Sequence, residues 1–127
     1  MEPLFIKEAE DTPKIILNKQ ENNFEISGKS LPEEVIRFYA PVLNWLDRYV
    51  ASPNDKTIFK IKLEYVNSAS QMTIHEILSV LERIKDQDKD IEVEWYFMED
   101  DDEMRESGEE YSEIINIPFK FIGYVPD

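Results

Sequence analysis

The sequence predicts a single α/β domain with a mixed, mainly parallel sheet that follows an N-terminal hairpin and is joined by about three major helices. Segments with an apolar period of two alternate with segments of helical period, in the order β-β-β-α-β-α-β-α-β. A chain of 127 residues has room for one core, so one domain should span residues 1–127. Charged residues on one face of both central strands predict helices mainly on the other side of the sheet.

The N-terminal third should form short strands. Leu4-Phe5-Ile6 is a candidate edge strand, and Thr12-Pro13 marks a boundary because the residue before a proline avoids helical geometry. Ile15-Ile16-Leu17 and Phe24-Glu25-Ile26 then flank the polar segment 18–23. This pattern predicts a β-hairpin.

The first helix should follow this hairpin. Ser30-Leu31-Pro32-Glu33 has the spacing of a capping box, with proline in the first turn. Pro41 should kink or restart the helix, and the segment 52–55 should end it. The apolar stripe consists of Val35, Phe38, Tyr39, Val42, Trp45, Leu46 and Tyr49.

The central segment is a strand over 57–66 that leads directly into a second helix. Its apolar side chains (Phe59, Ile61, Leu63 and Tyr65) alternate with charged ones. Ser68 and Gln71 have capping-box spacing, which predicts a helix that begins at Ser68 and runs to about Asp86. The Ser68 hydroxyl should be exposed near the positive end of this helix.

The C-terminal third should add a strand, a helix and a last strand. Residues 91–97 alternate between apolar and polar and should pair beside 57–66. The acidic cluster Glu99–Glu103 suits the N-terminus of a third helix, which Gly108 should weaken. That helix should carry Met104, Tyr111, Ile114 and Ile115, and Phe119, Phe121 and Tyr124 suggest the last strand.

Composition excludes several classes of function. The formal net charge of −14 would repel nucleic acid and anionic membrane surfaces. The chain has no cysteine, so it has neither disulfides nor thiolate metal sites. Its first residues are acidic where a signal peptide is basic, and no apolar run approaches the length of a membrane span. We therefore expect a cytoplasmic protein.

The sequence offers no recognisable catalytic site, and no cofactor or metal is expected. With three glycines, neither a P-loop nor a dinucleotide fingerprint can be assembled. His75, the only histidine, lies beside the apolar stripe of the second helix and should be an ordinary helix side chain. The acidic cluster lacks the spacing and central glycine of an EF-hand loop, so it should be a solvated surface.

A set of short motifs, in a consistent order, connects the chain to a known family. They are Thr12-Pro13 with Ile15, Phe24-x-Ile26-x-Gly28 followed by Ser30-x-Pro32-Glu33, Trp45-Leu46, Leu63-x-Tyr65-x-Asn67, Glu94-Trp95-Tyr96, Gly108-Glu109-Glu110-Tyr111 and Pro118-Phe119. With these motifs the chain resembles the SiaC family of bacterial regulatory phosphoproteins over nearly its whole length. The resemblance implies a fold like that of the STAS anti-sigma-factor antagonists.

The resemblance also implies a mechanism. The family's phosphoacceptor follows the asparagine at the strand end and is usually threonine; here it is Ser68, and Ser70 is a second candidate. A kinase and a PP2C-type phosphatase would control the phosphate. The unphosphorylated form would bind and activate a diguanylate cyclase and so promote biofilm formation through cyclic di-GMP. We expect the partner surface to include Tyr65, Asn67, Ser70 and Gln71.

Other interpretations stay open at this point. Ser68 could simply cap the second helix, because capping serines are common. An anti-sigma-factor antagonist would use the same switch on a different partner. A sensor domain would bind a small ligand near residues 65–70. An enzyme ranks last, because no convergent acid, base and nucleophile are evident.

Overall fold

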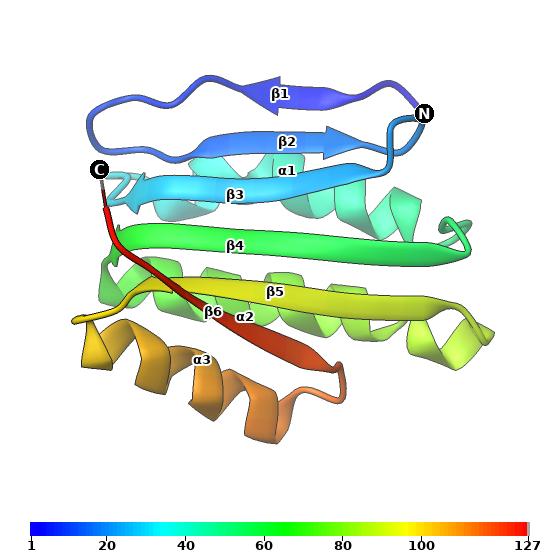
Figure 1. The fold of residues 1–127 in the computed structure, drawn as a ribbon. Coiled ribbons are helices and arrows are strands. Elements are labelled where there is room, and N and C mark those ends of the chain that lie inside the picture. Colours follow the sequence, from blue (N-terminus) through cyan, green and yellow to red (C-terminus); the bar gives the residue numbers. More distant parts are fainter. Residues whose placement is uncertain (127) are drawn as a thin grey trace.

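Six strands form one mixed sheet in which neighbours in sequence are neighbours in space (Figure 1). The structure is a computed structural model that describes residues 1–126, so the final position of the predicted 1–127 domain lies outside the described residues. The elements are β1 (Leu4–Ile6), β2 (Lys14–Asn18), β3 (Asn23–Ser30), α1 (Val35–Tyr49), β4 (Lys56–Val66), α2 (Ser68–Glu82), η1 (Lys85–Gln87), β5 (Asp90–Met98), α3 (Asp102–Ile114) and β6 (Phe119–Tyr124). No helix within residues 1–126 is both long and apolar enough to cross a membrane.

The strand directions match the predicted mixed sheet. β1, β2 and β3 pair antiparallel, as an N-terminal hairpin with an extra edge strand. β3, β4, β5 and β6 pair parallel. Parallel neighbours need a crossover connection, and each of the three crossovers here contains one of the helices. The predicted α/β class with three major helices is therefore confirmed.

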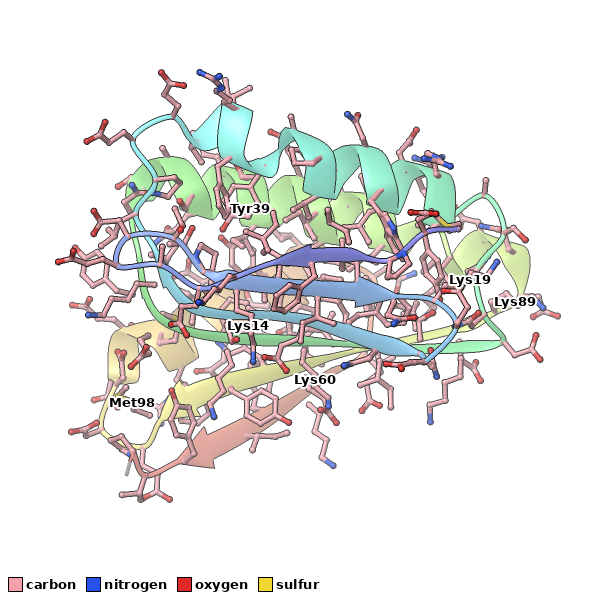
Figure 2. The ribbon with its side chains drawn as sticks, turned by 90° about the horizontal axis from the view of Figure 1, so that it is seen from above. Lys14, Lys19, Tyr39, Lys60, Lys89 and Met98 are labelled. Carbon is pink, nitrogen blue, oxygen red and sulfur yellow. The ribbon has the colours of Figure 1, made fainter. Side chains whose placement is uncertain are left out.

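The helices cover one face of the sheet, as the alternation of charged residues predicted. Tyr39 lies between the sheet and the helical layer, whereas Lys60 extends from the opposite face (Figure 2). Phe24 of β3 packs against Tyr49 of α1, with ring centroids 4.9 Å apart, and against Phe59 of β4 at 6.4 Å. Trp95 of β5 likewise lies 5.6 Å from Tyr111 of α3, measured between ring centroids. The apolar face of the sheet thus meets helix side chains, and no helix of the described residues covers the other face.

The start of α1 differs from the sequence prediction. Glu34 occupies the N-cap position without a side-chain hydrogen bond, and the expected Ser30 capping box does not form. Ser30 is instead the last residue of β3, where it pairs with Val66 and is fully buried. The helix also continues through Pro41, which is exposed, while the opposite apolar stripe is packed into the core. Tertiary packing therefore outweighs both local signals.

Gly108 has a packing role that the sequence analysis missed. The indole Nε1 of Trp95 donates a hydrogen bond to the carbonyl oxygen of Met104 at 3.0 Å, which fixes the ring beneath α3. A Cβ atom on Gly108 would lie 2.6 Å from Cδ1 and Nε1 of that ring. Glycine therefore allows α3 to approach β5 closely, and its low helix propensity is outweighed by this contact.

We predict that Gly108→Ala destabilises the protein. In an exposed helix this change would add about 1 kcal/mol of stability, because alanine has the higher helix propensity. Here the new methyl group must displace a buried, hydrogen-bonded indole, and overpacking typically costs about 1–3 kcal/mol. Chemical denaturation should therefore give a lower free energy of unfolding than for the wild type. The neighbouring Ser107→Ala is the control, and an increase in stability for Gly108→Ala would contradict the packing role.

Candidate functional site

The helix N-termini gather at one edge of the sheet. Because β3, β4 and β5 are parallel, their carboxyl ends meet there, and α1, α2 and α3 each begin just beyond them (Figure 1). Ser68, the first residue of α2, follows the end of β4 at this edge. A hollow of about 150 Å³ separates the β4–α2 turn from the start of α3, and Glu64, Tyr65, Gln71, Asp101 and Glu103 line it. The predicted turn and the acidic cluster are therefore neighbours in space.

Asn67, rather than Ser68, caps helix α2. The Asn67 side-chain oxygen accepts a hydrogen bond from the Ser70 amide at 2.8 Å, and the Asn67 backbone is extended. The Asn67 amide donates to the Ser30 carbonyl at 3.1 Å, which ties the turn to the end of β3. The predicted capping box of Ser68 and Gln71 is thus wrong, because the preceding asparagine already supplies the acceptor that the first turn needs.

This correction leaves the Ser68 side chain uncommitted to the cap. Ser68 is exposed, as is Ala69 after it, and both lie in the first turn of an ordered helix. The first turn of α2 contains no acidic residue. A hydroxyl at such a position is accessible to a modifying enzyme, and the free amides at a helix N-terminus favour a negative group.

Ser70, the second candidate, is in a different environment. Its side chain is 0% exposed, and its Oγ accepts a hydrogen bond from the Ser30 hydroxyl at 2.9 Å. The Ser30 hydroxyl lies 2.6 Å from that of Tyr39 on α1. These three residues form a buried hydroxyl chain that joins α1, α2 and β3. Burial raises the pKa of Tyr39 to about 12, against the opposing effect of the Ser30 hydrogen bond. A kinase could reach Ser70 only if this chain opened.

The predicted partner residues separate into exposed and structural positions. Tyr65 is 57% exposed and Gln71 is also exposed, although its carbonyl accepts a hydrogen bond from the Tyr111 hydroxyl at 2.8 Å. Asn67 and Ser70 hold the turn together instead. Sequence reasoning missed Met72, which is 73% exposed on α2. The exposure of Met72 could have been predicted from the sequence, because this apolar residue lies outside the buried stripe of α2.

The acidic cluster serves the start of α3. Asp101 is the N-cap, and its carboxylate accepts a hydrogen bond from the Met104 amide at 3.0 Å, while Asp102 and Glu103 lie in the first turn. Within residues 1–126, no group of three or more histidine, aspartate or glutamate side chains is arranged to hold a metal ion. His75 is exposed, with its ring centroid 6.3 Å from that of Tyr111.

Sequence comparison finds relatives over nearly the whole chain. A family model described as SiaC family regulatory phosphoprotein matches residues 6–124. An uncharacterized protein of Pseudomonas aeruginosa (strain UCBPP-PA14) is 25% identical over 119 residues, and the match covers 94% of each chain.

Structural comparison finds the same architecture in solved proteins. Apo-SiaC from Pseudomonas aeruginosa superposes with a TM-score of 0.86 at 25% identity, and the match covers 96% of this chain and 99% of that one. A chain in the crystal structure of the diguanylate cyclase SiaD in complex with its activator SiaC, from the same organism, gives a TM-score of 0.88 at 24% identity. That match covers 95% of this chain and 99% of the other.

The cap assignment predicts different effects for two adjacent substitutions. Asn67→Ala removes the acceptor of the Ser70 amide, and loss of an N-cap typically costs about 0.5–2 kcal/mol. Ser68→Ala removes an exposed hydroxyl and should change the free energy of unfolding by less than about 0.5 kcal/mol. Urea denaturation of both variants measures the difference, and a larger loss for Ser68→Ala would return the cap to Ser68.

Two tyrosines with raised pKa values predict sensitivity to alkaline pH. Burial raises the pKa of both Tyr39 and Tyr111 to about 12 from 10.0, and the charge of Glu110 adds to the effect at Tyr111. Above pH 10 the folded state therefore retains protons that the unfolded state releases. The free energy of unfolding should fall as the pH rises from about 10 toward 12, and less steeply in Tyr39→Phe. Tyr65→Phe, at an exposed position, is the control; equal slopes for wild type and Tyr39→Phe would contradict the prediction.

Proposed function

The chain belongs to the SiaC family of regulatory phosphoproteins, and we propose that it is a non-enzymatic switch in which phosphorylation of Ser68 controls binding to an effector protein. The observation that carries the proposal is the position of the Ser68 hydroxyl, exposed in the first turn of α2 and not used by the cap. Ser70 is a weaker acceptor, since its buried hydroxyl is bonded to Ser30.

The fold should tolerate a phosphate on Ser68. A phosphoserine carries a charge of about −1.5 to −2 and three acceptor oxygens. At the N-terminus of α2 these oxygens meet free amide groups and the positive end of the helix dipole. Since α2 has no acidic residue in its first turn, the phosphate would supply a favourable charge that the helix lacks.

The same phosphate should oppose binding to a partner. Exposed Tyr65 and Met72 flank Ser68 in sequence and offer apolar contact area. The hollow between the β4–α2 turn and α3 is already lined by Glu64, Asp101 and Glu103. An added charge would be desolvated on binding, and a loss of about 2.7 kcal/mol already reduces affinity a hundredfold.

We assign the effector to the diguanylate cyclases. SiaC of Pseudomonas aeruginosa is described as the activator of the cyclase SiaD, and a chain in that complex shares this fold. In the proposed cycle a kinase adds the phosphate, a PP2C-type phosphatase removes it, and the unphosphorylated chain activates the cyclase in the cytoplasm. The output would be a change in cyclic di-GMP and, through it, in biofilm formation.

A pull-down from native lysate tests this function. Wild type and Ser68→Ala should recover a diguanylate cyclase, identified by mass spectrometry, and Ser68→Asp should recover at least tenfold less, equivalent to about 1.4 kcal/mol. Ser52→Asp is the matched control, because it adds the same charge in the exposed loop before β4, at the opposite edge of the sheet. The Tm of Ser68→Asp should equal that of the wild type or lie slightly above it.

Several outcomes would reject the assignment. Equal recovery of the cyclase by Ser68→Asp and wild type would remove Ser68 from the switch. Recovery of an anti-sigma-factor kinase in place of a cyclase would reassign the chain to the antagonist class. If the cyclase is recovered, its rate of cyclic di-GMP synthesis with purified wild-type chain should exceed its rate alone, and an unchanged rate would reject activation.

A further inference from the structure

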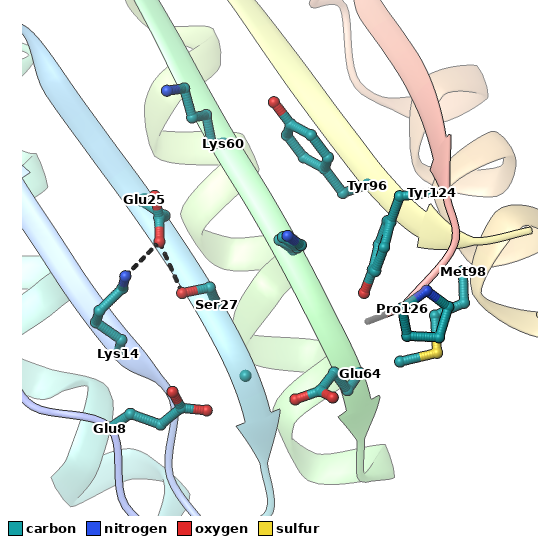
Figure 3. A pocket seen from close by; sticks show the side chains of 12 residues that line it. Glu8, Lys14, Glu25, Ser27, Lys60, Glu64, Tyr96, Met98, Tyr124 and Pro126 are labelled. Atoms are coloured by element: carbon teal, nitrogen blue, oxygen red, sulfur yellow. Dashed lines mark hydrogen bonds and ion pairs between the residues drawn. The ribbon is translucent and has the colours of Figure 1, made fainter.

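The uncovered face of the sheet contains a second, larger hollow. Its volume is about 560 Å³, which lies within the range of small-molecule sites, and it crosses strands β2 to β6 (Figure 3). Three of its lining residues are lysines, in a chain whose net charge is −14. Its lining shares one residue, Glu64, with the smaller hollow beside the Ser68 turn.

One lysine in the hollow is already neutralised. Lys14 forms an ion pair with Glu25 at 3.1 Å, and the Ser27 hydroxyl donates to the same carboxylate at 2.7 Å. Burial raises the pKa of Glu25, but the Ser27 hydrogen bond and the Lys14 ammonium outweigh it, so that the pKa lies below its ordinary value. Glu25 therefore stays charged at neutral pH, paired with Lys14 and close enough to Lys60 for that charge to act on it.

The other two lysines lie on β4, and one of them, Lys62, lies beside aromatic rings. Lys60 and Lys62 are two residues apart, so both side chains project from the same face of the sheet. The Lys62 ammonium lies 4.6 Å from the ring centroid of Tyr124 and 5.9 Å from that of Tyr96. Within the described residues, no carboxylate lies within 4.0 Å of either ammonium group. Lys60 is nevertheless in register with Glu25 of β3 and Glu94 of β5, and its charge helps to lower the pKa of Glu25. This end of the hollow offers positive charge next to flat rings.

The opposite end of the hollow is acidic. Glu64 continues the same alternation on β4, about 13 Å from Lys60 along an extended strand. The Glu8 carboxylate lies against Gly28, where any side chain would collide with it. Figure 3 places Glu8 and Glu64 toward the same end of the hollow and Lys60 toward the other. A complementary ligand is therefore anionic at one end and rich in hydrogen-bond donors at the other.

We propose that this hollow binds a purine mononucleotide. Its phosphate would lie between Lys60 and Lys62, because no carboxylate among the described residues lies within 4.0 Å of either ammonium group. Its base would stack on Tyr124 in place of the Lys62 ammonium, which would turn from that ring toward the phosphate. The donor groups of base and ribose would face Glu64 and Glu8, which as carboxylates can only accept. Inorganic phosphate would satisfy only the lysines, and an amino acid is too short to reach both charged ends.

Isothermal titration of the full chain with GMP and AMP tests the proposal. At least one nucleotide should bind with a Kd below about 1 mM, and adenosine and ribose 5-phosphate should bind at least tenfold more weakly. Lys62→Gln should weaken nucleotide binding at least tenfold. Lys120→Gln, on β6 outside the lining of the hollow, is the matched control and should stay within twofold.

Each alternative outcome decides against the nucleotide site. Absence of binding by both nucleotides at 5 mM, about fivefold above the expected limit, would overturn it. So would an unchanged affinity in Lys62→Gln, because the ligand would then bind elsewhere. Ribose 5-phosphate binding as tightly as GMP would indicate a simple anion site and would overturn the role of the rings. Amide chemical-shift changes should map to β4, β5 and β6, and changes confined to the 65–72 segment would place binding at the switch instead.

Discussion

Parallel pairing of β3, β4 and β5 is the constraint on which the rest of the molecule depends. Each parallel neighbour requires a crossover, and the three helices that supply the crossovers all begin at the same edge of the sheet. Ser68 and the acidic start of α3 are thereby brought to one surface, although they are distant in sequence. Because the helices also share one face, the other face is left free for the lysines and tyrosines of the larger hollow.

Two sets of hydrogen bonds hold the edge of the sheet around Ser68 in place. The Asn67 side chain closes the first turn of α2, and the buried hydroxyl chain of Ser30, Ser70 and Tyr39 joins that turn to β3 and α1. Buried hydroxyl groups are costly unless they are paired, and no buried side-chain polar atom among the described residues lacks a partner. These hydrogen bonds fix the geometry of the β4–α2 turn, and the Ser68 side chain takes no part in them.

The order of strands and helices and the one-sided helical layer could be predicted from sequence, because they follow from local periodicity. The exposure of Ser68 could be predicted from its position between the end of a strand and the start of a helix, although the cap assigned to it was wrong. The roles of Ser30, Asn67 and Gly108 could not. Ser30 matched a capping pattern, but strand pairing with Val66 carried it into the core. Gly108 was expected to weaken α3, because the sequence does not show that Trp95 packs directly beneath it. The larger hollow combines residues from five strands, and their registers are fixed only by the completed sheet.

Because the β4–α2 turn is already held in one conformation by hydrogen bonds, the proposed switch could respond quickly. The turn is held by the Asn67 cap and by the buried Ser70 hydroxyl, so a phosphate on Ser68 would meet a surface that is already formed. In the proposed switch, the effector could then sense the charge without a prior folding or unfolding step. The time course of signalling would then follow kinase turnover, phosphatase turnover and effector dissociation, with no slower conformational step inside the chain itself.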